Sequence, residues 1–307
     1  AAASDYAIVF VGTISMEGKD RTSLSLDAGC QADPFAKSEQ CQGNDKNQTA
    51  LIEAAVKANP KTIVIASIPG AVLMPWSPRV PAILTNFMPG QEAGNAIADV
   101  LFGHVNPSAK LPITIPNREN ERNFTPAQWP GLSDASNPAY KYRYSYFSER
   151  LLVGYRYYDA HGIKFTTGFP FGHGLSYTRF TYSDLSIGKM KVAFTIRNAG
   201  EVRGAEVAQL YLGFPASAGE PPLQLRGFRK TRLLSPGESE RAEIQLRPRD
   251  FSIWDAKLHR WSLVEGSFVV MVGSSSRDER LQTSYLLRSR STVGEEASSA
   301  AGKRSPP

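Results

Sequence analysis

The chain has 307 residues, of which 41% are hydrophobic and 21% charged, a composition typical of globular proteins and long enough for two separate cores. Its net charge of +6 comes from lysines and arginines that are spread along the chain without forming a basic stripe, which argues against nucleic acid as a partner. No run of about 18 apolar residues occurs, so no membrane span is predicted. The chain starts at Ala1 without a signal peptide, and we expect it to be processed or truncated.

The first predicted element is a short buried strand over Ile8–Val11, which Gly12 ends. The loop behind it carries Glu17, followed by Asp20 and Arg21. In open α/β sheets the loops at the carboxyl ends of the strands bind ligands, so Glu17 lies where a general acid would act. A solvated loop carboxylate is the competing interpretation, and this stretch alone does not separate the two. Asp20 and Arg21 fit a local ion pair or a capping group better than a catalytic role.

Two cysteines, Cys30 and Cys41, lie in a polar loop without the histidines or the CxxC pattern of a zinc site. A disulfide between them would stabilise the fold by roughly 2–3 kcal/mol. Asn47 and Asn123 each begin an Asn-X-Thr glycosylation signal, a short pattern that also arises by chance. Together these features favour an extracellular, glycosylated protein with a Cys30–Cys41 disulfide.

Residues 1–116 predict part of an α/β domain. Their apolar strands lack the polar alternation of half-exposed strands, which indicates a mostly parallel sheet covered by helices on both faces. After the cysteine loop we predict a helix over Gln48–Asn59 with Leu51, Ile52, Ala55 and Val56 on one face, strands over Lys61–Ile68 and Val80–Phe87, a helix that opens at Pro89–Glu92, and a last strand over Leu111–Ile115.

Residues 117–188 predict a long loop and connector. The segment 117–146 is polar, contains prolines and has no hydrophobic periodicity, and loops of this length are usually functional or disordered. Its aromatic side chains either stack on a sugar ring or pin the loop to the protein surface, and the sequence leaves both interpretations open. These residues are Trp129, Tyr140, Tyr142, Tyr144 and Tyr146.

Residues 189–288 predict an all-β sandwich, because short strands recur between turns that contain proline and glycine. The predicted strands are Val192–Ile196, Glu206–Leu212, Leu225–Leu233, Ala242–Leu246 and Ser267–Val272. Trp254 and Trp261 are expected in the core of the sandwich or at a seam between domains. Residues 289–307 have the composition of a disordered tail.

Taken alone, the residues contain no complete catalytic set. The four histidines are far apart, and the chain has no phosphate-binding loop, no dinucleotide-binding glycine motif and no serine nucleophile elbow. We therefore predict neither a metal nor a cofactor.

Several motifs, in the same order, resemble the C-terminal half of glycoside hydrolase family 3. They are Glu17–Arg21, Pro89–Gly103, Val105–Ser108, Leu152–Asp159 and Phe169–Thr178. The sandwich resembles the fibronectin type III-like domain of that family through Gly204–Tyr211 and Leu225–Lys230, and the resemblance extends from Asp5 to about Leu287.

The resemblance implies a retaining glycosidase. In this family a glutamate on the α/β sandwich domain is the acid/base, and its motif falls on Glu17. The nucleophile is an aspartate on an N-terminal TIM barrel, which this chain lacks. The resemblance therefore implies the C-terminal portion of a β-glucosidase, inactive by itself, with the missing barrel as partner and an oligosaccharide or glucoside as substrate. A β-xylosidase of the same family and a non-catalytic carbohydrate-binding or structural module are the alternatives. Met16 and Ala109 depart from the family pattern, in which glycine or another small residue is common at the first position and glycine at the second.

Overall fold

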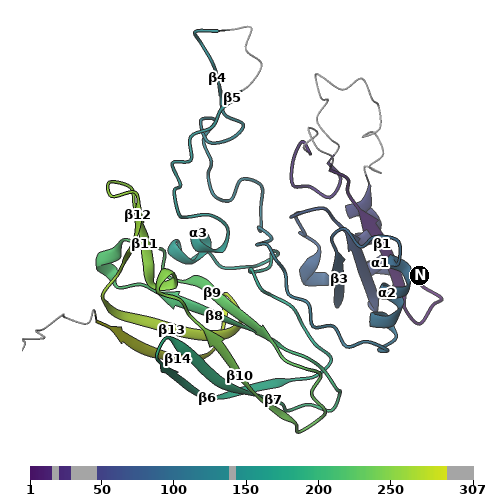
Figure 1. The fold of residues 1–307 in the computed structure, drawn as a ribbon. Helices are drawn as coiled ribbons and strands as arrows, with labels where there is room; N and C mark the ends of the chain where they lie inside the picture. Colours follow the sequence, from purple (N-terminus) through teal and green to yellow (C-terminus); the bar gives the residue numbers. More distant parts are fainter. Residues whose placement is uncertain (16–20, 29–46, 138–142, 289–307) are drawn as a thin grey trace, which may run out of the picture.

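The computed structural model describes residues 1–15, 21–28, 47–137 and 143–288 (Figure 1). The N-terminal part forms a small α/β unit and the C-terminal part forms a β-sandwich, while a narrow arm projects from the connector between them. The tail predicted for residues 289–307 lies outside the described residues. Within the described ranges, no helix is both long and apolar enough to cross a membrane.

The α/β unit contains a parallel sheet with β2 in the middle, as the apolar strand pattern predicts. Its elements are β1 (Ala7–Gly12), α1 (Gln48–Ala58), β2 (Thr62–Ser67), the short 3-10 helix η1 (Ser77–Arg79), β3 (Ala82–Asn86) and α2 (Ala93–Leu101). Helix α1 buries Ile52 and Ala55 in one apolar cluster with Val9 and Val11 of β1. One face of the sheet is thereby covered.

The second face of β1 is open, in contrast to the predicted cover on both faces. Ile8 and Phe10 alternate with the buried residues of β1 and are 44% and 62% exposed. Strand β1 is an edge strand, and α2 has no fully buried residue. Leu51 of α1 was expected on the buried face and is instead exposed.

The strand predicted over Leu111–Ile115 is absent. Ile115 forms only an isolated antiparallel bridge with Phe169. Leu111 exchanges backbone hydrogen bonds with Gly172 and His173, so the two segments run side by side without a continuous ladder. Proline explains the interruption, because Pro112 has no N–H to donate.

Two antiparallel sheets form the sandwich, with strand orders β10-β7-β6 and β14-β13-β8-β9. The strands are β6 (Phe180–Gly188), β7 (Lys191–Asn198), β8 (Val207–Gly213), β9 (Gln224–Lys230), β10 (Ser239–Gln245), β13 (Gly266–Ser275) and β14 (Asp278–Leu287). Phe194 of β7, Leu210 of β8 and Val270 of β13 are fully buried in the shared core. The five predicted strands are confirmed, and β6 and β14 are additional; β6 lies entirely before residue 189, in the segment predicted as loop and connector.

The two tryptophans of the sandwich are not in its core. They pair across the hairpin β11 (Ser252–Asp255) and β12 (Arg260–Leu263), which follows the short helices η2 (Ala216–Ala218) and η3 (Pro248–Phe251). Trp254 and Trp261 are 52% and 43% exposed, with ring centroids 5.8 Å apart. The prediction of a core position is therefore wrong, because the rings cover each other at the surface, while a position at a seam between domains stays a prediction.

Strand β8 is buried on both faces. Leu210 and Leu212 point into the sandwich core, while Tyr211 belongs to a second cluster with Tyr155 of α3 (Tyr155–Ala160). Tyr211 donates a hydrogen bond to Oε1 of Gln209 at 2.6 Å, and Gln209 Nε2 donates to the carbonyls of Gly172 (3.1 Å) and Ser274 (2.8 Å). The connector therefore forms part of the packing of this sheet.

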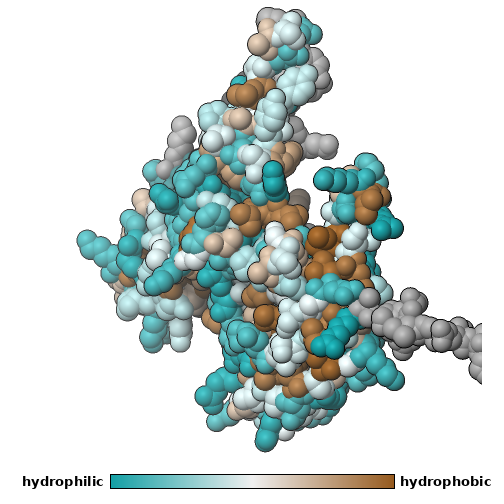
Figure 2. All heavy atoms as spheres, turned by 90° about the vertical axis from the view of Figure 1, so that its left-hand side faces the viewer, coloured by the Kyte–Doolittle hydropathy of each residue, from teal (hydrophilic) through white to brown (hydrophobic). Residues whose placement is uncertain are grey.

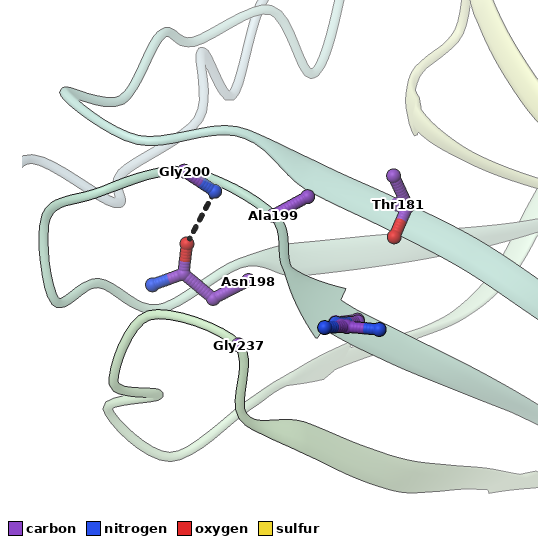
Figure 3. A pocket seen from close by; sticks show the side chains of 6 residues that line it. Thr181, Asn198, Ala199, Gly200 and Gly237 are labelled. Atoms are coloured by element: carbon purple, nitrogen blue, oxygen red, sulfur yellow. Dashed lines mark hydrogen bonds between the residues drawn. The ribbon is translucent and has the colours of Figure 1, made fainter.

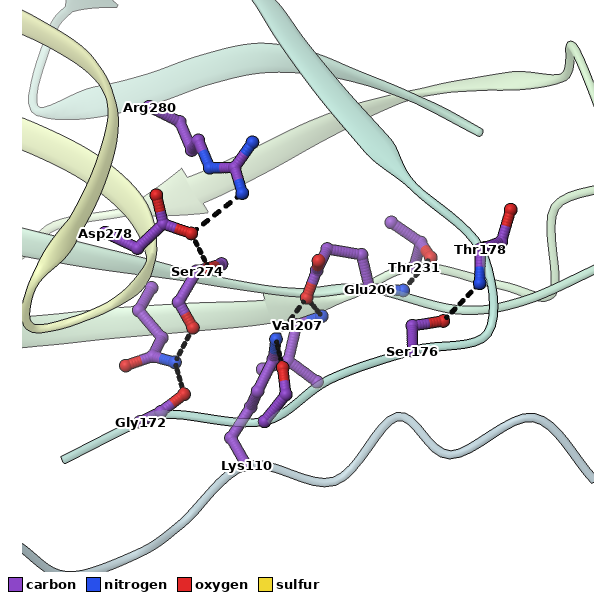
Figure 4. Close-up of polar contacts among 12 residues, drawn as sticks. Lys110, Gly172, Ser176, Thr178, Glu206, Val207, Thr231, Ser274, Asp278 and Arg280 are labelled. Atoms are coloured by element: carbon purple, nitrogen blue, oxygen red, sulfur yellow. Dashed lines mark hydrogen bonds and ion pairs between the residues drawn. The ribbon is translucent and has the colours of Figure 1, made fainter. Parts of the chain in front are cut away.

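A buried ion pair joins the α/β unit to the sandwich (Figure 4). Lys110 Nζ lies 2.9 Å from Glu206 Oε1, and both side chains are almost fully buried. Lys110 also donates to the carbonyl of Gly174, and Glu206 accepts a hydrogen bond from the backbone N–H of Val207 at 2.7 Å. The charges are thus satisfied within the junction.

Candidate active site

The carboxyl edge of the parallel sheet is the place where the sequence predicts a site. The backbone N–H of Gly12, the last residue of β1, donates to Oε1 of Gln48 at 2.8 Å, and the N–H of Thr13 donates to the carbonyl of Ser67 at 3.1 Å. A Cβ on Gly12 would lie 3.0 Å from that carbonyl oxygen, so a glycine allows this close approach. The carboxyl ends of strands β1 and β2 are therefore held together by hydrogen bonds.

A polar pair continues the same edge at β2 and β3. Ser67 Oγ donates to Oδ1 of Asn86 at 2.8 Å, and the N–H of Ile68 donates to the Asn86 carbonyl at 3.2 Å. The Nδ2 atom of Asn86 is buried and finds no hydrogen-bond partner among the described residues. Buried polar atoms without a partner are uncommon in folded proteins.

Arg21 lies just behind the loop that carries Glu17. Its Nη2 donates to the Ala71 carbonyl at 2.6 Å, while its Nη1 is buried without a partner within the described ranges. Burial lowers the pKa of Arg21, and the negative charge of Glu119 raises it. The carboxylate of Glu119 also accepts a hydrogen bond from the N–H of Leu24 at 2.8 Å. The chain that leaves the Glu17 loop is therefore fixed to two other segments.

Glu17 itself lies outside the described residues, as do Asp20, Cys30 and Cys41. Thr13 and Arg21 are each four residues from Glu17 in the sequence, and four residues of extended chain reach at most about 14 Å. The role of Glu17, the Asp20–Arg21 pair and the disulfide remain predictions.

The two predicted glycosylation sites lie at the surface. Asn47 precedes α1 and is exposed, and its side chain makes no capping hydrogen bond to that helix. Asn123 lies in the connector, is also exposed and has a positive φ of 52°. Both positions are accessible to a modifying enzyme, and their modification remains a prediction.

A shallow pocket in the sandwich offers no comparable chemistry (Figure 3). Its lining is Thr181, Arg197, Asn198, Ala199, Gly200 and Gly237, of which only Arg197 is ionisable. The Asn198 side chain is fully used by the fold, because its Oδ1 accepts from Thr178 Oγ1 at 2.6 Å and its Nδ2 donates to Leu234 O at 2.9 Å. Elsewhere in the described part of the chain, no three His, Cys, Asp or Glu side chains form a cluster suited to a metal ion.

Sequence reasoning did not single out Ser67, Asn86 or Glu119. For Ser67 and Asn86 a signal exists, since each is a polar residue at the end of an apolar strand. Glu119 is 95 residues from Leu24 and lies in a segment without periodicity, so no local pattern reveals this contact.

The comparison with family models identifies the chain. Residues 1–177 match the glycosyl hydrolase family 3 C-terminal domain, and residues 206–276 match the fibronectin type III-like domain. The chain belongs to glycoside hydrolase family 3. The Glu17–Arg21 motif and the parallel sheet both fall within the first match.

Curated relatives of this family 3 chain include β-glucosidases. It is 37% identical over 301 residues to thermostable beta-glucosidase B of Acetivibrio thermocellus, a match that covers 94% of this chain and 36% of the relative. It is 39% identical over 312 residues to probable beta-glucosidase L of Aspergillus terreus, covering 93% of this chain and 39% of the relative. The chain thus spans little more than a third of the length of these relatives.

Solved structures show the same architecture. DesR, a beta-glucosidase from Streptomyces venezuelae solved with D-glucose, superimposes with a TM-score of 0.81 at 33% identity, covering 94% of this chain and 34% of that protein. The beta-D-glucoside glucohydrolase of Trichoderma reesei gives a TM-score of 0.72 at 34% identity, covering 92% of this chain and 40% of that protein. The arrangement of parallel sheet, connector and sandwich is therefore that of family 3.

Proposed function

We propose that this chain is the C-terminal part of a retaining β-glucosidase that removes terminal β-D-glucosyl residues from oligosaccharides or glucosides. The proposal is carried by the resemblance of Glu17–Arg21 to the acid/base motif of family 3, a stretch that follows β1 in the sequence and lies within the family match. The β-glucosidase names of the relatives and the glucose bound to a structural neighbour support the choice of sugar.

In the proposed reaction Glu17 acts twice. A retaining glycosidase needs two carboxyl groups about 5–5.5 Å apart, one as nucleophile and one as acid/base. Glu17 first donates a proton to the leaving glycosidic oxygen while the nucleophile forms the glycosyl-enzyme. It then removes a proton from water, which attacks the sugar carbon and releases the nucleophile.

The described residues supply the frame for this loop. Gly12 is bonded to Gln48 on one side of Glu17 in the sequence, and Arg21 is bonded to the Ala71 carbonyl on the other. Fixed ends restrict where the loop between them can go. Such support is what a general acid requires, because proton transfer needs the carboxyl group within hydrogen-bond reach of the leaving oxygen.

The nucleophile is proposed to come from an N-terminal TIM barrel of the same protein. The relatives are more than twice as long as this chain, which leaves room for such a domain. The open apolar face of β1, with Ile8 and Phe10, also supports additional protein at this edge of the sheet. We further propose an extracellular location, a Cys30–Cys41 disulfide, and glycosylation at Asn47 and Asn123.

Steady-state kinetics of the full-length protein on aryl β-glucoside and aryl β-xyloside test the proposal. We expect the larger kcat/KM on the glucoside. The larger value on the xyloside would instead assign a β-xylosidase, and no turnover of either substrate would favour a non-catalytic module. The isolated 307-residue chain serves as the control and should be inactive, because a single carboxylate cannot carry out double displacement.

A further inference from the structure

The connector forms an arm that has no core of its own. We define the arm as residues 117–137 and 143–153; its only strands are β4 (Leu132–Ser133) and β5 (Arg143–Tyr144). Among its residues only Gly131 is buried. Figure 1 shows the arm rising away from both the sandwich and the α/β unit.

Seven large apolar side chains of the arm are exposed. They are Trp129, Leu132, Tyr144, Tyr146, Phe147, Leu151 and Val153, with exposed fractions between 44% and 76%. Half-exposed side chains of this size present roughly 100 Å² each, so together they offer about 700 Å², close to the ~800 Å² per partner of a standard protein interface. Apolar surface of this extent marks an interaction site. In Figure 2 the upper part of the molecule, where the arm stands, is mostly teal and white with a few brown groups.

The exposed side chains come from two branches of the arm that lie against each other. The N–H of Tyr146 donates to the Ala127 carbonyl at 2.9 Å, and Leu132 pairs with Tyr144 in the β4–β5 ladder. A Cβ on Gly131 would lie 2.8 Å from the Tyr144 carbonyl oxygen, so the branches are in direct contact. Leu132 and Tyr144 are therefore direct neighbours, and the other exposed apolar side chains stand on the same two joined branches.

The base of the arm is fixed beside the candidate site. Glu119 accepts the hydrogen bond from Leu24, seven residues after Glu17 in the sequence. Asn117 Oδ1 accepts from the N–H groups of Thr166 (2.7 Å), Thr167 (3.1 Å) and Gly168 (3.1 Å). The arm thus leaves the protein at a defined point next to the chain that carries Glu17.

The proposed chemistry requires a second part of the protein near the base of the arm. The proposed reaction needs a second carboxylate about 5–5.5 Å from that of Glu17. The protein part that supplies it has to approach the chain that continues to Leu24, to which the base of the arm is hydrogen-bonded. Relatives such as beta-glucosidase B have more than half of their length outside the span that this chain matches. A protein domain of that size, bound at the Glu17 loop, is expected to contact the arm.

We propose that the arm is a docking surface for the part of the protein that precedes this chain in its longer relatives, an inference that rests on the proposed function. Aromatic side chains are enriched in the buried centres of protein interfaces, and Trp129 and Phe147 are the anchors. The aliphatic side chains of Leu132, Leu151 and Val153 fit a protein surface better than a sugar, which is recognised by flat rings with polar groups beside them.

Site-specific photo-cross-linking in the full-length protein tests this inference. Phe147 is replaced by the photoreactive residue benzoylphenylalanine, and the cross-linked peptides are identified by mass spectrometry after irradiation. We expect a cross-link within one molecule to a peptide that precedes Ala1. The matched control is the same replacement at Phe228 of β9, which is 68% exposed against 76% for Phe147 and should give no such cross-link.

The other outcomes would overturn the inference. A cross-link between two molecules would assign the surface to a second copy, and a cross-link suppressed only by added cello-oligosaccharide would assign it to carbohydrate. No cross-link at Phe147, in a protein that still hydrolyses an aryl β-glucoside, would refute the docking surface and leave the proposed function intact. Absence of hydrolysis would refute the proposed function separately.

A pair of double variants measures the contribution to stability. Trp129→Ser with Phe147→Ser should lower the Tm of the full-length protein by several degrees, because two interface anchors are lost. Leu258→Ser with Phe228→Ser is the control, since Leu258 is exposed to the same degree as Trp129 and this pair should leave the Tm nearly unchanged. Equal shifts in the two double variants would contradict the inference.

Discussion

Lys110 Nζ and Glu206 Oε1 lie 2.9 Å apart in the junction between the α/β unit and the sandwich. The side chains are only 12% and 9% exposed, so little of either charge is left for water. Breaking a buried pair by removing one partner leaves an uncompensated charge, whereas replacing both partners with apolar groups is often neutral. The pair is therefore expected to link the stability of the two parts.

We expect Lys110→Met to lower the free energy of unfolding by about 3–5 kcal/mol. The double variant Lys110→Met with Glu206→Leu should recover most of that loss. Urea unfolding followed by circular dichroism measures both. Lys191→Met is the control, because Lys191 and Glu243 are about half exposed and such pairs contribute at most about 1 kcal/mol. Similar losses in Lys110→Met and Lys191→Met would contradict the prediction.

The carboxylates of Asp250 and Asp159 are expected to change acid stability in opposite directions. Burial opposes ionisation of Asp250, but hydrogen bonds from the Arg247 side chain and backbone outweigh it and hold the pKa below its usual value. Burial raises the pKa of Asp159, and Arg277, 2.6 Å away, offsets this only in part.

The signs follow from which state takes up the proton first. At Asp250 the unfolded state is protonated first as the pH falls. The ionised Asp250 carboxylate therefore stabilises the folded state above about pH 3.9, and this stabilisation is lost as the pH falls through the lower folded-state pKa. At Asp159 the folded state is protonated first as the pH falls. The contribution of Asp159 to stability is therefore lost as the pH rises from about 3.9 through the raised folded-state pKa. Unfolding free energies at a series of acidic pH values should show less acid loss than wild type in Asp250→Asn and more in Asp159→Asn. Shifts of the same sign would refute this.

Gly172→Ala is expected to destabilise the chain by about 1–3 kcal/mol, because a side chain would be forced into a strained conformation. Gly172 has a φ of +80°, and an added Cβ would collide with the Gln209 side chain. Gly188→Ala is the control, since a Cβ there meets nothing within 4 Å. Urea midpoints of the two variants decide the question, and an unchanged midpoint for Gly172→Ala would contradict the prediction.

In the full-length protein, Glu17→Ala should cripple cellobiose hydrolysis, because general acid catalysis contributes roughly 10²–10⁴ in rate and the leaving group is poor. Formation of the glycosyl-enzyme from dinitrophenyl glucoside should suffer much less, since that leaving group needs no proton. Azide should then restore turnover by attacking the glycosyl-enzyme without base assistance. An equal loss on both substrates without azide rescue would mean that Glu17 is not the acid/base.

Cys30 and Cys41 are expected to be linked in protein recovered from the culture medium, because they lie in one polar loop and a glycosylation signal follows. Peptide mapping without reductant should find the two cysteine peptides joined. Two free thiols would rule out the disulfide.

The local sequence pattern predicts those helices and strands that are marked by a continuous or periodic run of apolar residues. The apolar runs of β2 and β7 appear as strands at the expected places, and α1 begins and ends within a residue of its prediction. Strand β6 escapes the pattern, because Asp184 has a φ of +55° and the ladder shifts register between Ser183 and Ser186. Pro112 has the opposite effect, since it breaks a strand that apolarity alone predicts.

Contacts between distant segments are not visible in the sequence. The exposed position of Trp254 depends on its pairing with Trp261 across a hairpin, which composition does not reveal. At the candidate site, the position of Glu17 after a strand and the family motif single it out in the sequence, while the contacts of Ser67 and Glu119 depend on the arrangement of the whole sheet and connector. Hydrophobic periodicity shows which face of a helix or strand is apolar, but it does not show which other segment packs against that face.

The two-sided burial of β8 has a consequence for anyone who wishes to transplant the sandwich into another protein. The matched segment 206–276 contains β8 but neither β6 nor β7, which form most of the opposite sheet, nor β14, which pairs with β13. It also omits Tyr155 and Gly172, which cover the outer face of β8. A gene fragment cut at those limits should yield insoluble protein, and a soluble graft has to begin upstream of α3 and continue through β14.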